Sequence, residues 1–425
     1  MKSREETTLK TISRVSFVFI LLIIFTLQVP TETMAAFGSS TLNGQSLQNP
    51  DYVTVAKVTR LTAPVHIKAH SSSQTIAVLK KNQEFPIILT AKYYYLVQML
   101  DGKKGWIRKS YTSVRKANRY VAGWNYLGGS DKFKESSTSS NLDIVMPRWY
   151  RLQEEGLIST SPDKSYVDWA HAKGKKVWSM LGNGFDMELT DRILSSPANR
   201  VEVIGKIKDS LIINEIDGLN VDFENMNMEN REDFVIFVRD LKKALSESGK
   251  IVSVDVTREN PDPNWSGSYN RAGLGEAADF VIMMGYDEYY EGRGVSESVA
   301  SLSWVEDGLR KLLKDVPSHK VLLGVPFYTR EWITPSGGGG ATARDFTMKD
   351  SVNWISQHGL TKKWDPAAKQ NYVEYTDSAG RHQMWLEDQT SMTARWNLVK
   401  KYSLAGVSAW AIGQESTDIW NVFNK

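Results

Sequence analysis

The chain has 425 residues, which is enough for one large domain and one small one. Its hydrophobic content of 41% and charged content of 24% are those of a globular protein, and they argue against a disordered or fibrous chain. The absence of Cys excludes disulfides, so core packing must supply the stability.

The first 36 residues have the layout of a signal peptide. Residues 1–14 carry four basic side chains, an apolar run follows at 15–29, and Pro30, Ala35 and Ala36 come next. The apolar run is short for a membrane span, although an uncleaved N-terminal anchor is the alternative. We therefore expect an exported protein, located outside the cell, in the cell wall or in a spore envelope.

A linker rich in Ser, Asn and Gly is predicted at 37–52, followed by a small all-β domain at 53–115. Short β-like runs occupy 77–79, 85–89, 93–100 and 105–107, and Asp101-Gly102 is a strong hairpin signal. Between Lys57 and Lys116 there are twelve Lys/Arg and two acids, a charge of +10, although the whole chain carries only +3. A basic exported domain suits an anionic cell wall, whereas a merely solvated lysine-rich surface is the alternative.

This region resembles bacterial SH3-like domains. The resemblance is clearest at residues 101–107, Asp-Gly-Lys-Lys-Gly-Trp-Ile, followed by Ser110-Tyr111. The sequence departs from that family at 65–70, and Tyr94 replaces its usual strand Trp. The resemblance implies a small barrel that binds the wall.

The large domain is predicted at 118–425. Buried strand-like runs alternate with helical segments there, at 120–126, 142–147, 175–183, 216–224, 251–257, 280–286, 320–328 and 405–412. The best helical segment is 231–245, where Phe234, Val238, Leu241 and Leu245 form one apolar stripe after the N-cap candidate Asn230. Eight such strands predict an α/β fold, a (β/α)8 TIM barrel. The longest gap, about 334–390, is predicted to hold a small α+β insertion.

Residues 216–225 read Ile-Asp-Gly-Leu-Asn-Val-Asp-Phe-Glu-Asn and are the most informative stretch. In a strand, Asn220, Asp222 and Glu224 share one face and the intervening apolar residues share the other. This suits a barrel strand with apolar groups toward the helices and polar groups toward the centre. Two neighbouring acids also push their pKa values apart, which general acid catalysis can use. The alternative is that both acids end a strand and face water.

Other strand ends carry polar and aromatic side chains, and barrel enzymes place their chemistry at the C-terminal ends of strands. The candidates are Trp124 and Tyr126 on strand one, Asn183 on strand three, Met284, Tyr286 and Asp287 on strand six, Tyr328 and Arg330 on strand seven, and Trp410 on strand eight.

These motifs resemble glycoside hydrolase family 18, whose active-site motif is Asp-Gly-x-Asp-x-Asp-x-Glu. Asp217, Gly218, Asp222 and Glu224 match it, while Asn220 stands where the family usually has Asp, as in a subgroup resembling bacterial spore-cortex and cell-wall N-acetylglucosaminidases. Residues 283–287 and 324–330 resemble the family's Met-x-Tyr-Asp and Gly-x-Pro-x-Tyr-x-Arg.

The resemblance implies substrate-assisted retaining hydrolysis, in which the N-acetyl group of the substrate attacks its own anomeric carbon. It makes Glu224 the general acid and base, Asp222 the partner of the acetamido N–H, and Tyr286 a donor to the acetamido oxygen. Asp287 and Arg330 would hold sugar hydroxyls, and Trp410 would stack beneath the sugar. We also expect Asn220 to donate an N–H to Asp222, which would keep Asp222 ionised and alter the acid limb of the pH profile.

The sequence thus predicts an exported hydrolase of β-1,4 bonds at N-acetylglucosamine residues of peptidoglycan, in the cell wall or the spore cortex. The alternatives are a chitinase or endo-N-acetylglucosaminidase acting on other glycans, and a non-catalytic sugar-binding barrel. We expect no cofactor, no metal site, no nucleic-acid partner and a monomeric chain.

Overall fold

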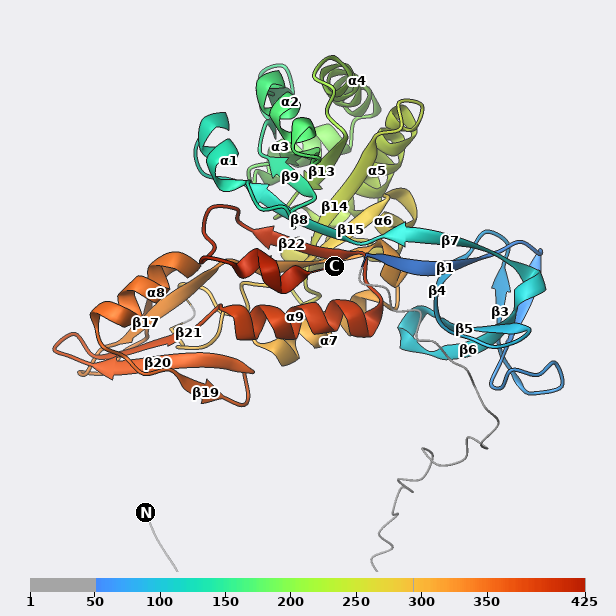
Figure 1. The fold of residues 1–425 in the computed structure, drawn as a ribbon. Helices are drawn as coiled ribbons and strands as arrows, with labels where there is room; N and C mark the ends of the chain where they lie inside the picture. The colour runs from blue at the N-terminus through green and yellow to red at the C-terminus, as the bar shows by residue number, and fades with distance from the viewer. Residues whose placement is uncertain (1–50, 293, 425) are drawn as a thin grey trace, which may run out of the picture. The chain divides into compact units, whose positions relative to one another are not determined.

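The computed structural model describes residues 51–292 and 294–424, all within one compact unit that spans residues 44–425. The predicted signal peptide and nearly all of the predicted linker lie outside the described residues. The described chain forms three sheets, of which the middle one in chain order is a closed parallel barrel (Figure 1). No helix in the described part of the chain is long and apolar enough to cross a lipid bilayer.

The first sheet is antiparallel and has seven strands in the order β3-β2-β6-β5-β4-β1-β7. Val65, Phe85, Val97 and Ile107 belong to its buried core. The predicted runs fall on β3 to β6, whereas β1, β2 and β7 were not predicted. Its strands are β1 (Tyr52–Val58), β2 (Thr62–His66), β3 (Thr75–Lys80), β4 (Glu84–Thr90), β5 (Tyr94–Gln98), β6 (Lys104–Arg108) and β7 (Thr112–Asn118).

The turn between β5 and β6 confirms the hairpin signal of Asp101-Gly102. The chain reverses through a short 3-10 turn at Leu100–Gly102, and β5 and β6 pair antiparallel on either side of it. Gly102 has a φ of +75°, a left-handed conformation that glycine adopts without steric cost.

The barrel contains eight parallel strands, and each of the eight predicted runs contains one of them. The ring closes because β9 pairs with both β8 and β12, and β22 pairs with β8. The strands are β8 (Tyr120–Asn125), β9 (Ile144–Pro147), β12 (Lys176–Gly182), β13 (Gly218–Asp222), β14 (Ile251–Thr257), β15 (Phe280–Met284), β16 (Val321–Pro326) and β22 (Gly406–Trp410). Two short strands, β10 (Tyr150–Leu152) and β11 (Ile158–Thr160), extend the sheet beside β12.

One glycine allows the β22–β8 seam to close. Gly406 pairs with Tyr120 and has a φ of +143°. A Cβ on this residue would lie 1.8 Å from the Tyr120 carbonyl oxygen, so a side chain here would force the two strands apart.

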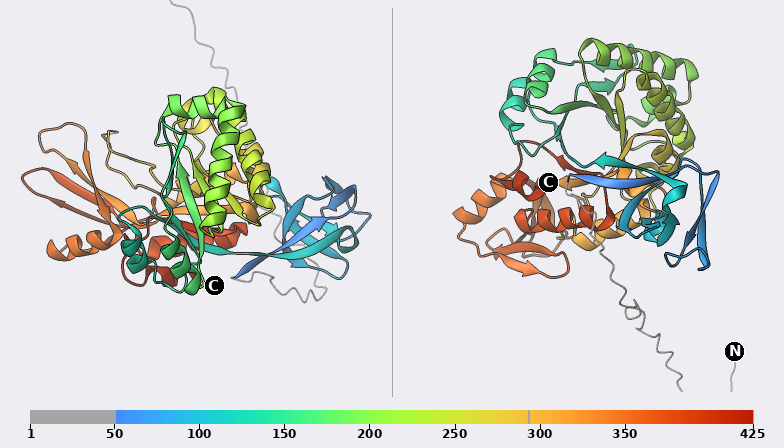
Figure 2. Two further views of the ribbon diagram at one scale, coloured as in Figure 1. Left: turned by 90° about the horizontal axis from the view of Figure 1, so that it is seen from above. Right: turned by 45° about the vertical axis from the view of Figure 1, so that its right-hand side comes forward.

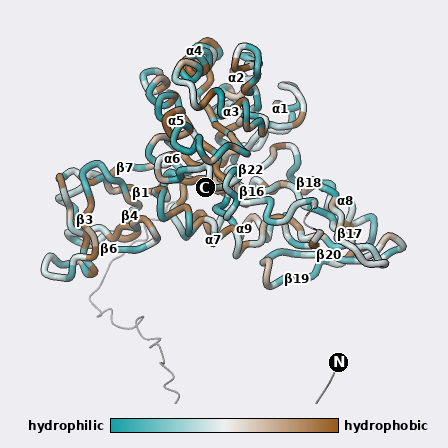
Figure 3. The backbone as a smooth tube through the Cα atoms, turned by 180° about the vertical axis from the view of Figure 1, so that it is seen from behind, coloured by the Kyte–Doolittle hydropathy of each residue, from teal (hydrophilic) through white to brown (hydrophobic). Residues whose placement is uncertain are grey.

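Helices surround the ring, as the views in Figure 2 show. The large apolar core lies between strands and helices, and a second cluster of Trp124, Met146, Trp178 and Ile282 fills the ring itself. In Figure 3 the helices carry both hydrophobic and hydrophilic segments, as expected when one face is buried. They are α1 (Ser130–Ser136), α2 (Lys164–Ala172), α3 (Met187–Leu194), α4 (Pro197–Ile213), α5 (Arg231–Ser246), α6 (Arg271–Ala277), α7 (Leu302–Leu312) and α9 (Gln389–Tyr402).

Helix α5 confirms the predicted stripe but corrects its predicted cap. The stripe is fully buried, and Phe234 stacks on Phe223 with ring centroids 5.5 Å apart. Asn230 occupies the N-cap position, yet its side chain makes no cap hydrogen bond and donates instead to Asp191 at 2.7 Å. A tertiary contact has thus replaced the local one.

The third sheet lies between β16 and β22 in chain order and is antiparallel. It starts at residue 328, slightly before the predicted insertion, and packs around Trp332, Trp354, Val373 and Met384. Its elements are β17 (Tyr328–Thr334), β18 (Thr342–Thr347), α8 (Met348–Gln357), β19 (Lys363–Asp365), β20 (Gln370–Thr376) and β21 (Arg381–Trp385).

Candidate active site

Strand β13 carries acids into the barrel because its side chains alternate as predicted. Leu219, Val221 and Phe223 are fully buried in the core between strands and helices. Asn220 therefore points into the ring, Asp222 follows it at the end of the strand, and Glu224 comes two residues later. Both acids are half-buried, which rules out the alternative that they simply face water.

Both acids hold protons more tightly than ordinary carboxyls. Burial raises the pKa of Asp222 to about 7, and the positive charge of Arg148 opposes this rise. Burial, and then the negative charges of Asp222 and Asp287, raise the pKa of Glu224 well above its usual range. A carboxyl in this state can act as a proton donor near neutral pH.

Asn183 fixes the backbone that carries Glu224. Its amide nitrogen donates to the Glu224 carbonyl at 2.8 Å and to the Thr190 hydroxyl at 2.9 Å. Its amide oxygen accepts the N–H groups of Glu224 at 3.1 Å and Phe185 at 3.3 Å. Asn183 was predicted to contact substrate, but these contacts and its 2% exposure favour a role in positioning Glu224.

Asn220 makes different contacts from those expected. Its amide oxygen accepts the indole N–H of Trp124 at 2.8 Å. Its amide nitrogen donates to Ser253 at 3.1 Å and to Asp255 at 2.7 Å. Since an amide nitrogen has two hydrogens, none is left for Asp222, and the predicted bond from Asn220 to Asp222 is wrong.

Asp255 is a buried acid that the sequence analysis missed. It lies in the middle of β14, with only 1% of its surface exposed. The signal was available, because Ser253 and Asp255 alternate with Val252, Val254 and Val256. The apolar alternation predicts a barrel strand at 251–257 but does not by itself single out the acid.

A polar cluster at the ends of β15 and β16 contains four of the predicted residues. Asp287 accepts hydrogen bonds from the Tyr328 hydroxyl at 2.6 Å and from Arg330 at 2.8 Å. Tyr286 packs edge-on against Tyr328, with centroids 6.2 Å apart. Met284 is buried and, because it alternates with Met283 of the outer core, faces the ring.

Aromatic rings from β8 and β22 form the next part of the site, beside the end of β16. Trp410 packs against Tyr126 at 4.8 Å and Trp124 at 5.7 Å between ring centroids. The guanidinium of Arg148 lies 4.3 Å from the centre of the Tyr126 ring. The structure therefore brings Trp124, Tyr126 and Trp410 together, as predicted, and adds Arg148.

Two further aromatic residues flank β13 at the C-terminal ends of its neighbours. Phe185 follows β12 and Trp265 follows β14, and their rings are 5.8 Å apart. Phe185 is 56% exposed and Trp265 38% exposed, although large aromatic side chains are usually buried. Neither was identified from the sequence, because Phe185 lies in a turn and Trp265 in a short π-helical segment (Pro263–Gly267), and neither segment has a distinctive motif.

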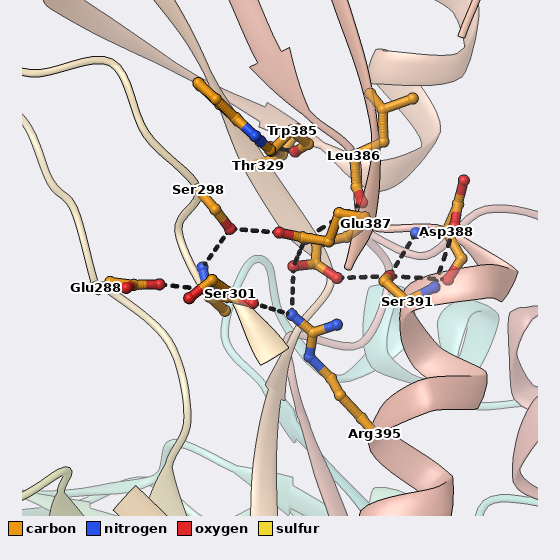
Figure 4. A network of polar contacts seen from close by, with 12 residues as sticks. Glu288, Ser298, Ser301, Thr329, Trp385, Leu386, Glu387, Asp388, Ser391 and Arg395 are labelled. Carbon is orange, nitrogen blue, oxygen red and sulfur yellow. Dashed lines mark hydrogen bonds and ion pairs between the residues drawn. The ribbon is translucent and has the colours of Figure 1, made fainter. Parts of the chain in front are cut away.

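A buried network of hydrogen bonds holds residues 298–301, which follow Asp287 in the chain (Figure 4). Glu387 accepts hydrogen bonds from Gln370 at 2.8 Å, Ser391 at 2.7 Å and Arg395 at 2.7 Å. Gln370 also accepts the hydroxyl of Ser298, and Arg395 donates to the Ala300 carbonyl at 2.6 Å. Burial raises the pKa of Glu387 to about 7. The network joins the third sheet and α9 to residues 298–300, while Arg330 holds Asp287.

The fold and the site together indicate the class of protein: a parallel barrel with paired acids and aromatic side chains at its C-terminal end is an arrangement that glycosidases use. Residues 120–415 match the family described as glycosyl hydrolases family 18, and the chain belongs to this family.

Proteins similar to this chain include a glycosylase, a cortical fragment-lytic enzyme and a chitinase. The uncharacterized glycosylase YvbX of Bacillus subtilis (strain 168) is 28% identical over 294 residues, which cover 67% of this chain and 84% of that protein. The cortical fragment-lytic enzyme of the same strain is 25% identical over 248 residues, 57% of each chain. A chitinase from Chromobacterium violaceum ATCC 12472 shares the fold, with a TM-score of 0.64 at 21% identity over 72% of this chain and 98% of that one.

We predict that Asp222→Asn stabilises the folded chain in a pH-dependent way. Folding raises the pKa of Asp222 to about 7, so it disfavours the ionised side chain. At about pH 4 and below, Asp222 is largely protonated in the folded chain and partly protonated in the unfolded chain, so the loss of folding free energy is small. The cost grows as the pH rises and is complete above about pH 7.

Urea unfolding should therefore show the variant to be more stable by on the order of 4 kcal/mol at about pH 8 and nearly equal to the wild type at about pH 4. A difference that does not change with pH would show that Asp222 is not held with a raised pKa.

Proposed function

We propose that this family 18 glycosidase is an exported enzyme that cleaves β-1,4 bonds at N-acetylglucosamine residues of peptidoglycan by substrate-assisted retaining catalysis. The proposal depends on the state of one carboxylate oxygen of Asp222. Within the described part of the chain, Oδ1 of Asp222 is buried and has no hydrogen-bond partner. An unsatisfied buried acceptor costs about 1–3 kcal/mol, and the acetamido N–H of a bound sugar would satisfy it.

Two side chains would divide the work of the first step. Glu224, protonated because of its raised pKa, would give its proton to the glycosidic oxygen as the bond to the leaving sugar breaks. At the same time the acetamido oxygen of the substrate would attack the anomeric carbon and form an oxazolinium ion. Asp222 would accept the acetamido N–H and offset the positive charge that develops.

Water would complete the reaction. Glu224, now ionised, would take a proton from water as the water attacks the anomeric carbon on the face opposite the acetamido oxygen. The bond between that carbon and the oxazolinium oxygen would break, which restores the neutral acetamido group. The carbon would invert twice, so its configuration would be retained. Tyr286 would donate to the acetamido oxygen, and Trp410 with Tyr126 would stack against the sugar.

Glu224→Gln should lower the rate of glycan hydrolysis by a factor between about 10² and 10⁴, because Gln is neutral but cannot give up a proton. Sugar binding should persist, since the amide has nearly the same shape. The measurement is release of reducing ends from purified peptidoglycan, with chitin oligomers in parallel and mass spectrometry of the products.

The products also decide the substrate. N-acetylglucosamine at the new reducing ends of peptidoglycan fragments is expected, whereas N-acetylmuramic acid there would contradict the proposed bond. Hydrolysis of chitin alone would favour the chitinase alternative. Equal product release by wild type and Glu224→Gln would exclude Glu224 as the acid.

Phe185 and Trp265 would bind the leaving part of the glycan. Glu224 lies after the fourth barrel strand, Trp410 ends the eighth on the opposite side of the ring, and the Phe185–Trp265 pair flanks the fourth. A chain with its reacting sugar on Trp410 and its glycosidic oxygen at Glu224 would continue toward this pair. Aromatic faces stack well on the apolar faces of sugars.

Replacing both Phe185 and Trp265 by Ala should lower kcat/KM for a glycan polymer by about tenfold. An aryl glycoside, whose leaving group is small, should be affected much less. Trp364→Ala is the control, since Trp364 is 50% exposed but lies on β19 of the third sheet, which pairs with no strand of the barrel. Equal losses on both substrates would contradict binding of the leaving group at this pair.

The seven-stranded sheet would attach the enzyme to the wall as an SH3-like domain. The support is its net charge of +10 between Lys57 and Lys116, together with the resemblance at residues 101–107. Anionic wall polymers would bind such a surface in a salt-dependent way.

Lys80→Glu with Lys81→Glu should weaken co-sedimentation with purified walls at low salt, because both side chains are exposed on or next to β3. Lys173→Glu with Lys243→Glu makes the same change of charge at exposed positions of the large domain and serves as the control. Equal loss of binding by both pairs would show that net charge alone governs attachment.

A further inference from the structure

Two arginines at the C-terminal ends of the barrel strands have no carboxylate partner. Arg148 follows β9, Arg151 lies on β10, and both side chains are exposed. In the part of the chain that the structure describes, neither guanidinium forms an ion pair or a hydrogen bond. Arg330 after β16, in contrast, is bound by Asp287. A guanidinium without such a partner can bind an anion that a ligand brings.

Arg148 lies beside the aromatic rings that would stack on the reacting sugar. Its guanidinium carbon is 4.3 Å from the centre of the Tyr126 ring, and that ring is 4.8 Å from the ring of Trp410. The charge of Arg148 also acts on Asp222 inside the site. These two contacts show that the guanidinium faces the site from the side of β8 and β9.

Arg151 lies against the turn that carries Phe185. It is on β10, which pairs with the end of β12, and its guanidinium covers Gly184. A Cβ on this glycine would lie 2.5 Å from a guanidinium nitrogen of Arg151. Since β8, β9 and β12 are consecutive in the ring, both arginines occupy the sector between Tyr126 and Phe185. A glycan that runs from Trp410 toward Phe185 would pass this sector.

We propose that Arg148 and Arg151 bind the carboxylate of an acidic sugar on the leaving side of the reacting N-acetylglucosamine, and that they thereby favour peptidoglycan over chitin. The inference rests on the proposed function and deepens it.

The two glycans differ in charge at the sugar that would reach the arginines. Every second sugar of peptidoglycan is N-acetylmuramic acid, whose lactyl ether ends in a carboxyl group that is free or linked to a peptide with carboxylates of its own. Chitin carries no charged group. A guanidinium binds a carboxylate through two parallel N–H···O hydrogen bonds, so an arginine pair discriminates between these glycans by charge.

Binding to the Glu224→Gln protein tests the inference without relying on catalysis. The probe is peptide-free glycan strands with free lactyl carboxyl groups, and the matched control is the same strands with these groups converted into methylamides. Adding Arg148→Gln and Arg151→Gln should weaken binding of the acidic strands about tenfold more than binding of the methylamide strands. Binding of the acidic strands should also lose much of its salt dependence. Isothermal calorimetry measures both effects, and thermal unfolding checks the fold.

The same two substitutions with Glu224 intact should lower the ratio of kcat/KM on acidic strands to kcat/KM on methylamide strands by a similar factor. Arg239→Gln with Arg310→Gln is the control variant, because it removes two positive charges from exposed positions on α5 and α7. This variant should leave the ratio unchanged.

The outcomes separate this inference from the proposed function. Equal losses on acidic and methylamide strands would overturn the inference and show that the arginines act through Asp222 or through the fold. An equal fall of the ratio in the control variant would overturn it as well, because net charge would then explain the preference. If the wild type releases no product from any strand, the proposed function fails, and binding to the Glu224→Gln protein still decides whether the arginines recognise the carboxylate.

Discussion

Taking charged groups out of water is the constraint on which the site depends. Strand β13 turns apolar residues toward the helices and polar residues into the ring, and closure of the barrel then removes water from the polar ones. Burial is the largest cause of the raised pKa values of Asp222, Glu224 and Asp255. The barrel is therefore stable in spite of these acids, and the core between strands and helices must offset what they cost.

The acids differ in how the protein satisfies them. Asp255 has the N–H of Asn220, whereas Asp222 keeps a buried oxygen without a partner in the described chain. Glu224 is held through its backbone by Asn183, which leaves its carboxyl group unconstrained by that contact. Such uneven satisfaction is expected where a ligand supplies the missing donors, and it contrasts with the buried Glu387, whose two oxygens are both engaged.

The residues around the acids also differ: some are held by hydrogen bonds and others are exposed. Asp287 is fixed by Tyr328 and Arg330, and the segment after it is tied to Gln370 and Arg395 (Figure 4). The exposed rings of Phe185 and Trp265 lie on the other side, next to the strand that carries the acids. The site is thus framed by groups at or after the ends of all eight barrel strands and by the third sheet.

The sequence by itself determined the elements and their direction, because period-two alternation and the apolar stripe of α5 are local patterns. All eight barrel strands, and the inward face of Asn220 and Asp222, could be read from it. Only the tertiary structure decided which partners these side chains take: Asn220 bonds to Asp255 on the next strand, and Asn230 bonds to Asp191 instead of capping its helix. Hydrogen bonds between segments far apart in the chain depend on register and closure, which no local pattern records. The same holds for Phe185 and Trp265, which lie in segments without a distinctive pattern and which only the closed barrel brings together.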